Sequence, residues 1–130
     1  MENKYTILVV DDDAGMLETM MDILSEMNFT VATADDGYKA IEMARDGAFD
    51  AILLDLKMPG IDGIETLKRI KKIKPLAKII ILTAYASEDT VLEAQREGVS
   101  EILCKPVDFD VLEKILIKDD ADAWSTLPCE

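Results

Sequence analysis

Short apolar runs alternate with segments of helical spacing along most of the chain. The runs predict β-strands, because the buried strands of a parallel sheet read as continuous apolar stretches. The predicted strands are residues 5–10, 30–34, 51–54, 79–82 and 101–104. Apolar positions three and four residues apart predict helices at 16–27 and 37–48, from 62 or 63 to just before Pro75, and at 87–98 and 108–116.

Five strands that alternate with five helices predict an α/β fold, with a parallel sheet covered by helices on both faces. Residues 30–34 suit an outer strand because their apolar and polar side chains alternate. The length of 130 residues is that of one domain. We expect this domain to span residues 1–118, followed by a partly disordered tail at 119–130 that carries three aspartates and Trp124.

The composition excludes several classes of function. No apolar run approaches the roughly 18 residues of a membrane span, and the N-terminus lacks the features of a signal peptide, so we expect a soluble cytoplasmic protein. The formal net charge of −13 disfavours direct binding to nucleic acid or to an anionic membrane. The chain has no histidine and therefore lacks the usual general base, the commonest zinc ligand and its own phosphohistidine chemistry.

Polar residues follow four of the predicted strands. They are Asp11, Asp12 and Asp13 after the first strand, Asp55 after the third, Thr83 after the fourth and Lys105 after the fifth. Ligands of open parallel sheets bind beyond the carboxyl ends of the strands, so we expect these side chains to converge. A buried carboxylate is costly unless it is paired, so Asp55 is expected at an exposed strand end. Asp13 is placed to cap the following helix.

The predicted cluster fits phosphate chemistry. Neighbouring carboxylates repel one another unless a cation neutralises them, and a divalent ion such as Mg²⁺ or Mn²⁺ suits oxygen ligands. Carboxylates of this cluster are the expected ligands. Asp55 is the expected nucleophile, which attacks phosphorus in line and forms an aspartyl phosphate. Lys105 would offset charge on the phosphoryl oxygens, and Thr83 would donate a hydrogen bond to one of them.

Four motifs also carry a family resemblance. They are Val9-Val10-Asp11-Asp12-Asp13, the segment from Asp55 to Gly63, Thr83-Ala84 and Lys105-Pro106. In this order and spacing they resemble the receiver domain of bacterial two-component response regulators, over about residues 4–118. The resemblance implies a flavodoxin-like (βα)5 sandwich of three layers with strand order 2-1-3-4-5.

The resemblance assigns roles to these positions. Asp55 matches the phosphorylated aspartate, Asp11 and Asp12 the acidic pair that holds Mg²⁺, and Lys57 the residue whose backbone carbonyl binds the metal. Thr83 matches the switch hydroxyl and Lys105 the phosphate-sensing lysine, whose peptide bond to Pro106 is commonly cis. The implied partner is a sensor histidine kinase or a histidine phosphotransfer protein that supplies the phosphoryl group. The chain would thus be a signalling phosphoacceptor rather than an enzyme.

The output surface of the family lies on the fourth helix, fifth strand and fifth helix, here about Ser87 to Lys118. We expect a downstream protein or a second copy to dock there. One position departs from the family: the aromatic switch residue three positions before the lysine is replaced by Ile102. How the signal spreads from the site is therefore left open.

Other functions fit these residues less well than a phosphoacceptor does. A phosphohydrolase with an aspartyl nucleophile usually has a second acid two residues later, where this chain has Lys57. Flavin phosphate would be repelled by Asp11 to Asp13. A scaffold that works unphosphorylated on the same fold stays open as an alternative.

Three further groups of residues are expected to be structural. Met16, Met20, Met21 and Met27 have the spacing of core-filling side chains. Cys104 and Cys129 are expected to be reduced thiols. The six basic residues between 68 and 78 are expected to form a solvated helix face rather than a docking site.

Overall fold

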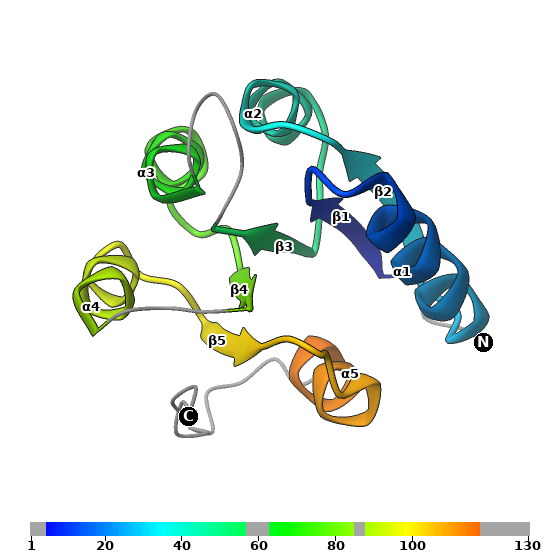
Figure 1. The fold of residues 1–130 in the computed structure, drawn as a ribbon. Coiled ribbons are helices and arrows are strands. Elements are labelled where there is room, and N and C mark those ends of the chain that lie inside the picture. The colour runs from blue at the N-terminus through cyan, green and yellow to red at the C-terminus, as the bar shows by residue number, and fades with distance from the viewer. Residues whose placement is uncertain (1–4, 57–62, 85–87, 118–130) are drawn as a thin grey trace.

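The computed structural model describes residues 5–56, 63–84 and 88–117, in which strands and helices alternate (Figure 1). The strands are β1 (Thr6–Val10), β2 (Thr30–Ala34), β3 (Ala51–Asp55), β4 (Ile79–Thr83) and β5 (Glu101–Cys104). The helices are α1 (Ala14–Glu26), α2 (Gly37–Asp46), α3 (Gly63–Ile73), α4 (Glu88–Arg96) and α5 (Phe109–Ile117). Within these ranges, no helix is both long and apolar enough to cross a membrane.

The strands form one parallel sheet in the order β2-β1-β3-β4-β5, which confirms the predicted topology. The register brings the strand ends to one level, because Val10 pairs with Leu54 and Thr83 with Cys104. Asp55 is the last residue of β3. The residues that follow β1 and β5 therefore lie at the same edge as Asp55, which we call the carboxyl edge of the sheet.

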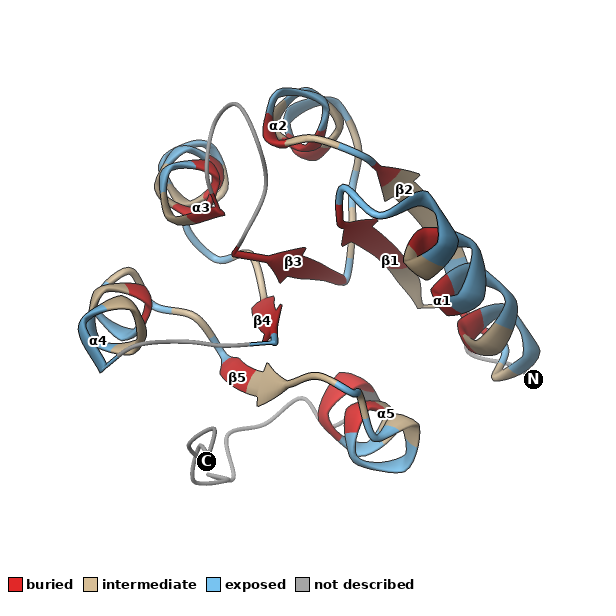
Figure 2. Ribbon diagram, viewed as in Figure 1, coloured by how far each residue is buried: buried red, intermediate tan, exposed pale blue. Residues whose placement is uncertain are grey.

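Helices cover both faces of the sheet and make three layers (Figure 1). Side chains of a strand point alternately to opposite faces, so Leu8 and Val10 share one core cluster while Ile7 and Val9 share the other. The first cluster contains residues of α2, α3 and α4, and the second contains residues of α1 and α5. Buried residues line the inner side of each helix and exposed residues the outer side (Figure 2).

Aspartates begin three of the helices at the carboxyl edge. The Asp13 carboxylate accepts hydrogen bonds from two N–H groups at the start of α1, as predicted. Asp36 accepts one from the Lys39 N–H at the start of α2, and Asp108 accepts two in the first turn of α5. Such caps satisfy helix N–H groups that have no partner inside the helix.

At the opposite edge of the sheet, which we call the amino edge, lysines donate hydrogen bonds to main-chain carbonyls. Lys74 Nζ donates to the carbonyl of Gly47, the C-cap of α2, at 3.0 Å, and Lys78 Nζ donates to the carbonyl of Ile115 in the last turn of α5 at 2.7 Å. Lys71 Nζ donates to two carbonyls in the connection between α3 and β4. The prediction that the basic residues between 68 and 78 form a solvated face is therefore partly wrong, since three of their ammonium groups are bound to main-chain carbonyls.

Other local predictions are also corrected. The second helix ends at Asp46 and not at residue 48, because Gly47 is extended and donates its N–H to the Met43 carbonyl. Met21 is 36% exposed on α1 and so does not fill the core, whereas Met20 does. Cys104 is disulfide-bonded, which contradicts the expected reduced thiol. The predicted tail at 119–130 lies outside the described residues.

Candidate functional site

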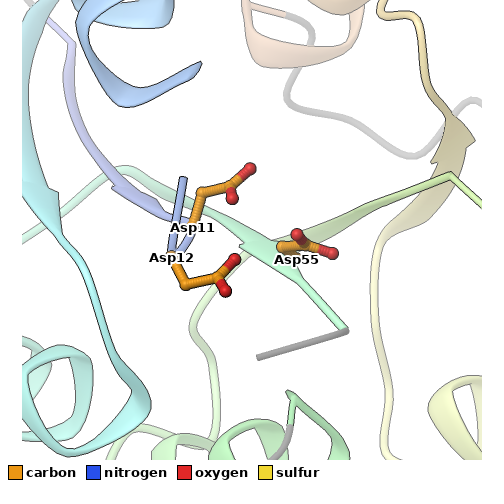
Figure 3. A group of neighbouring side chains, drawn as sticks. All are labelled: Asp11, Asp12 and Asp55. Atoms are coloured by element: carbon orange, nitrogen blue, oxygen red, sulfur yellow. The ribbon is translucent and has the colours of Figure 1, made fainter. Parts of the chain in front are cut away.

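Three carboxylates meet at the carboxyl edge, as the sequence predicts (Figure 3). Asp11 and Asp12 follow β1, and Asp55 ends the neighbouring β3. One oxygen from each carboxylate can be chosen so that all three lie within 4.8 Å of one another. Asp11 and Asp55 are only 4% and 7% exposed, whereas Asp12 is exposed to solvent. The group is thus open to solvent on the Asp12 side.

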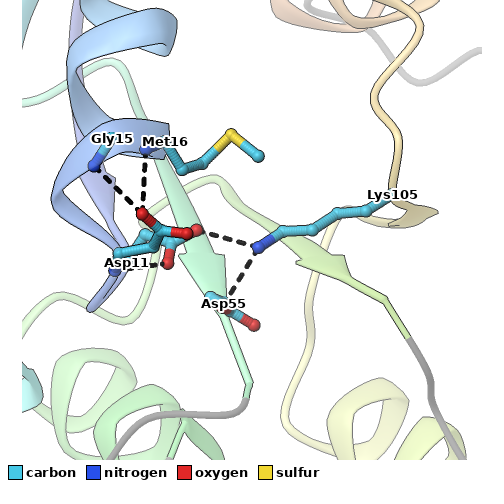
Figure 4. A network of polar contacts seen from close by, with 6 residues as sticks. Asp11, Gly15, Met16, Asp55 and Lys105 are labelled. Carbon is cyan, nitrogen blue, oxygen red and sulfur yellow. Dashed lines mark hydrogen bonds and ion pairs between the residues drawn. The ribbon is translucent and has the colours of Figure 1, made fainter.

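Lys105 joins the two buried carboxylates (Figure 4). Its Nζ donates to Asp11 Oδ2 at 2.8 Å and to Asp55 Oδ2 at 3.2 Å, although it lies 94 positions from the first and 50 from the second. The expected exposed position of Asp55 is therefore wrong. This carboxylate lies in a buried position and is paired there with an ammonium group, which reduces the cost of its burial.

The carboxylates govern the charge state of Lys105. Burial by itself lowers the pKa of the Lys105 ammonium, but hydrogen bonds and attraction from Asp11 and Asp55 outweigh that effect and raise the pKa above its ordinary value. Lys105 is therefore charged at neutral pH. One ammonium offsets only part of the charge of three carboxylates, so the site retains an excess of negative charge.

This donor set fits a small divalent cation. All three candidate ligands are carboxylate oxygens, which Mg²⁺ and Mn²⁺ prefer. Asp12 is exposed, so an ion can approach without the core opening. The backbone of Lys57, another expected ligand, lies outside the described residues.

The structure also shows where Thr83 and the Lys105–Pro106 segment lie. Thr83 is the last residue of β4, is fully buried, and lies one strand from Asp55. Its carbonyl accepts the backbone N–H of Lys105 at 2.9 Å, which links the ends of β4 and β5. The Lys105–Pro106 peptide bond is cis, as the family resemblance implies.

A tight connection follows Asp55. The N–H of Gly63, the first residue of α3, donates to the carbonyl of Leu56 at 3.0 Å. A Cβ atom at position 63 would lie 2.3 Å from the Leu56 Cα, so only glycine allows α3 to start this close to β3. Gly63 therefore fixes the start of α3 beside the site.

Sequence patterns missed the apolar wall of the site. Met16, Leu82 and Val107 line the space beside Asp11, Asp55 and Lys105. The helical spacing of Met16 with Met20 predicts only a core-filling side chain, because it says nothing of what lies at the strand ends. An apolar wall limits the access of water to the buried carboxylates and strengthens charge interactions there.

The fold and the site together define an α/β protein with a cation-competent acidic cluster at the carboxyl edge of its sheet. The chain belongs to the response regulator receiver domain family, whose model matches residues 7–117. As a receiver domain, it is a signalling phosphoacceptor rather than an enzyme that turns over a separate substrate.

Curated relatives include regulators longer than this chain. The transcriptional regulatory protein ZraR of Klebsiella oxytoca is 44% identical over 85% of the chain, which matches 25% of that protein. The sporulation initiation phosphotransferase F of Bacillus subtilis is 34% identical over 86% of the chain and 90% of its own length. The chain thus spans about a quarter of the length of ZraR and nearly all of the second relative.

Solved structures share the fold. A response regulator receiver domain from Methanospirillum hungatei has a TM-score of 0.83 and 32% identity, covering 87% of this chain and 91% of its own. A receiver domain of a Pseudomonas aeruginosa sensor histidine kinase, solved with magnesium in its active-site cleft, has a TM-score of 0.80 and 28% identity, covering 88% and 95%. A Burkholderia pseudomallei response regulator, with a TM-score of 0.80 and 27% identity over 88% and 66%, was solved with a phosphorylated aspartic acid and calcium.

Proposed function

We propose that Asp55 accepts a phosphoryl group from a phosphohistidine of a sensor histidine kinase or histidine phosphotransfer protein. One observation carries this assignment: of the three clustered carboxylates, Asp55 is the one that both ends a central strand and contacts Lys105. Asp11 contacts Lys105 as well, but it follows β1 instead of ending a strand. A phosphoaspartate in a related response regulator supports the same chemistry.

We assign the metal site to Asp11, Asp12 and Asp55, together with the backbone carbonyl of Lys57. The three carboxylates lie close enough to share one ion. Mg²⁺ is the expected occupant, with Mn²⁺ as a substitute, and magnesium in the related Pseudomonas domain supports this choice. When bound, the ion neutralises charge on the carboxylates and on the phosphoryl oxygens.

The transfer forms one bond and breaks one. A carboxylate oxygen of Asp55 attacks phosphorus in line, and the P–N bond of the donor breaks, with its electron pair leaving on the histidine nitrogen, which is protonated. The Lys105 ammonium offsets charge on a phosphoryl oxygen. Thr83 is assigned the hydroxyl that donates to another oxygen once Asp55 is modified.

The charge added to Asp55 rearranges the surface formed from α4, β5 and α5, within about residues 87–118. Leu92 and Val111 supply exposed apolar side chains on this surface, 50% and 38% exposed, for a downstream protein or a second copy. Ile102 is 3% exposed and belongs to the core. Because this residue is isoleucine, position 102 has no aromatic side chain that could rotate in response. A cytoplasmic location accompanies the proposal, because ATP-derived phosphoryl donors are found there.

Small phosphodonors test the assignment without the natural kinase. The protein is incubated with Mg²⁺ and either acetyl phosphate or phosphoramidate, whose P–N bond resembles that of phosphohistidine, and its intact mass is measured. The wild type should gain one phosphoryl group, and a chelator should prevent the gain. Asp55→Asn should gain none, whereas Asp36→Asn, a control that keeps an oxygen cap at the same edge, should label like the wild type.

Three outcomes would contradict the assignment, and two of them would favour an alternative function. A phosphoryl group that labels Asp55→Asn as fast as the wild type would remove Asp55 as the acceptor. Multiple turnover of a small phosphomonoester would favour a phosphohydrolase. No labelling under any condition would favour a scaffold that works unphosphorylated.

A further inference from the structure

Asp13 performs two tasks at the junction of β1 and α1. Its side chain is the N-cap of α1, where Oδ1 accepts the N–H of Gly15 at 3.0 Å and that of Met16 at 3.3 Å (Figure 4). Its own backbone N–H points the other way and donates to Asp11 Oδ1 at 3.0 Å. The cap fixes the backbone of Asp13, and that backbone in turn holds a carboxylate of the site.

Asp11 is thereby held at both oxygens. Oδ1 accepts the Asp13 N–H and Oδ2 accepts the Lys105 ammonium. The side chain of Asp11 is 4% exposed, so a rotation would break two hydrogen bonds in a buried place. Asp13 itself is exposed and does not belong to the group of carboxylates that can share an ion.

We propose that Asp13 is a positioning residue for the metal ligand Asp11, and this inference rests on the proposed function. The Asp13 carboxylate locks its own backbone through the cap, and the locked N–H fixes the orientation of Asp11 toward Asp55. A hydrogen-bond partner that orients a metal ligand raises metal affinity because less order is lost on binding. The requirement is an acceptor oxygen at position 13, not its negative charge.

Matched substitutions separate the acceptor from the charge. Asp13→Asn keeps an oxygen that can accept the N–H of Gly15 and Met16 and removes the charge, whereas Asp13→Ala removes both. Asp36→Ala is the control, since it also deletes one charge and one N-cap at the same edge but leaves Asp11 untouched. Asp13→Gly is a second variant without an acceptor, because glycine at an N-cap costs less helix stability than alanine.

Mg²⁺ affinity of the full chain is measured by calorimetric titration. We expect Asp13→Ala and Asp13→Gly to weaken Mg²⁺ binding by about tenfold, and Asp13→Asn and Asp36→Ala by no more than about twofold. Hydrogen exchange of the backbone amide at position 13, measured without metal, should become faster in Asp13→Ala and Asp13→Gly, which lack the acceptor, and stay slow in Asp13→Asn.

Equal loss of affinity in Asp13→Asn and Asp13→Ala would overturn the inference, because charge alone would then account for the loss. Unchanged affinity in Asp13→Ala and Asp13→Gly would overturn it as well. If the wild type binds no Mg²⁺, the proposed metal site fails instead, and the amide exchange still reports whether the cap holds the Asp13 N–H.

Discussion

The two edges of the sheet are built from opposite charges. At the amino edge, lysines donate to carbonyls at or near helix ends, as Lys74 and Lys78 do for α2 and α5. At the carboxyl edge, aspartates accept from N–H groups at helix starts, as Asp13 and Asp36 do for α1 and α2. Both arrangements match the helix dipole, which favours anions at its N-terminus and cations at its C-terminus.

The edges differ in how far their charges are balanced. Lys71, Lys74 and Lys78 each donate to a main-chain carbonyl at the amino edge, and these contacts stabilise the fold. The carboxyl edge has three clustered carboxylates and one bridging ammonium, Lys105. An edge with surplus like charge is less stable than it could be, and a bound cation would neutralise that surplus and so reduce the repulsion of an incoming phosphoryl group.

Removal of Lys105 should have the largest effect on stability. In Lys105→Met, the buried Asp11 and Asp55 lose their shared cation, so the free energy of unfolding without metal should fall by about 2 kcal/mol. Excess Mg²⁺ should recover much of this loss, because the ion takes over the neutralisation. Urea unfolding with and without Mg²⁺ measures both quantities. An equal loss with and without Mg²⁺ would show that the lysine and the ion do not serve the same carboxylates.

The pH dependence of this contribution follows from the raised pKa of Lys105. A pKa above the ordinary value of 10.5 means that the ammonium stabilises the fold fully below the unfolded pKa and loses this effect as the pH rises through the folded pKa. The stability difference between the wild type and Lys105→Met should therefore stay constant from about pH 7 to about pH 10 and shrink above that. Urea unfolding across this range tests it, and a difference that fades by about pH 8 would contradict the raised pKa.

Lys78→Met should cost less, about 1.5 kcal/mol, because a charged donor to the last turn of α5 is lost while the apolar stem is kept. The loss should be the same with and without Mg²⁺, which separates the amino edge from the carboxyl edge. Lys72→Met, an exposed position on the neighbouring α3, is the matched control and should change little. Faster hydrogen exchange confined to the end of α5 would locate the effect. A loss that Mg²⁺ reverses would break the distinction between the edges.

The smallest effect is expected at Lys68, which pairs with Glu93 across α3 and α4 at 3.1 Å on the surface. Both side chains are more than two fifths exposed, so solvent screens the pair. Lys68→Met should leave the urea midpoint unchanged within error. A shift as large as that of Lys78→Met would mean that position in the basic segment, and not the carbonyl contact, determines the contribution.

The sequence was enough to predict the fold and to predict which polar residues lie close together. An apolar run such as Ile79 to Leu82, too short for a helix and bounded by polar residues, fits a buried strand, and parallel strands bring their ends together whatever the details of packing. Asp11, Asp12 and Asp55 could therefore be grouped without coordinates, and the structure does group them.

Properties set by distant partners could not be predicted. The burial of Asp55 depends on Lys105, 50 positions away, and the lysine caps depend on where α2 and α5 end in space. The hydrogen bond from the Asp13 N–H to Asp11 depends on the direction of the backbone after β1, which the sequence does not show either. Local pattern carries none of this, since backbone direction and contacts between distant segments are set by the folded chain.

The most direct test of the central claim is the position of the phosphoryl group. The chain is phosphorylated with acetyl phosphate and Mg²⁺, reduced with borohydride, which converts an aspartyl phosphate to homoserine, and sequenced by tandem mass spectrometry. The proposed function predicts homoserine at position 55 and at no other aspartate, including Asp11 and Asp12. Homoserine elsewhere, or a phosphoryl label that resists reduction, would contradict it.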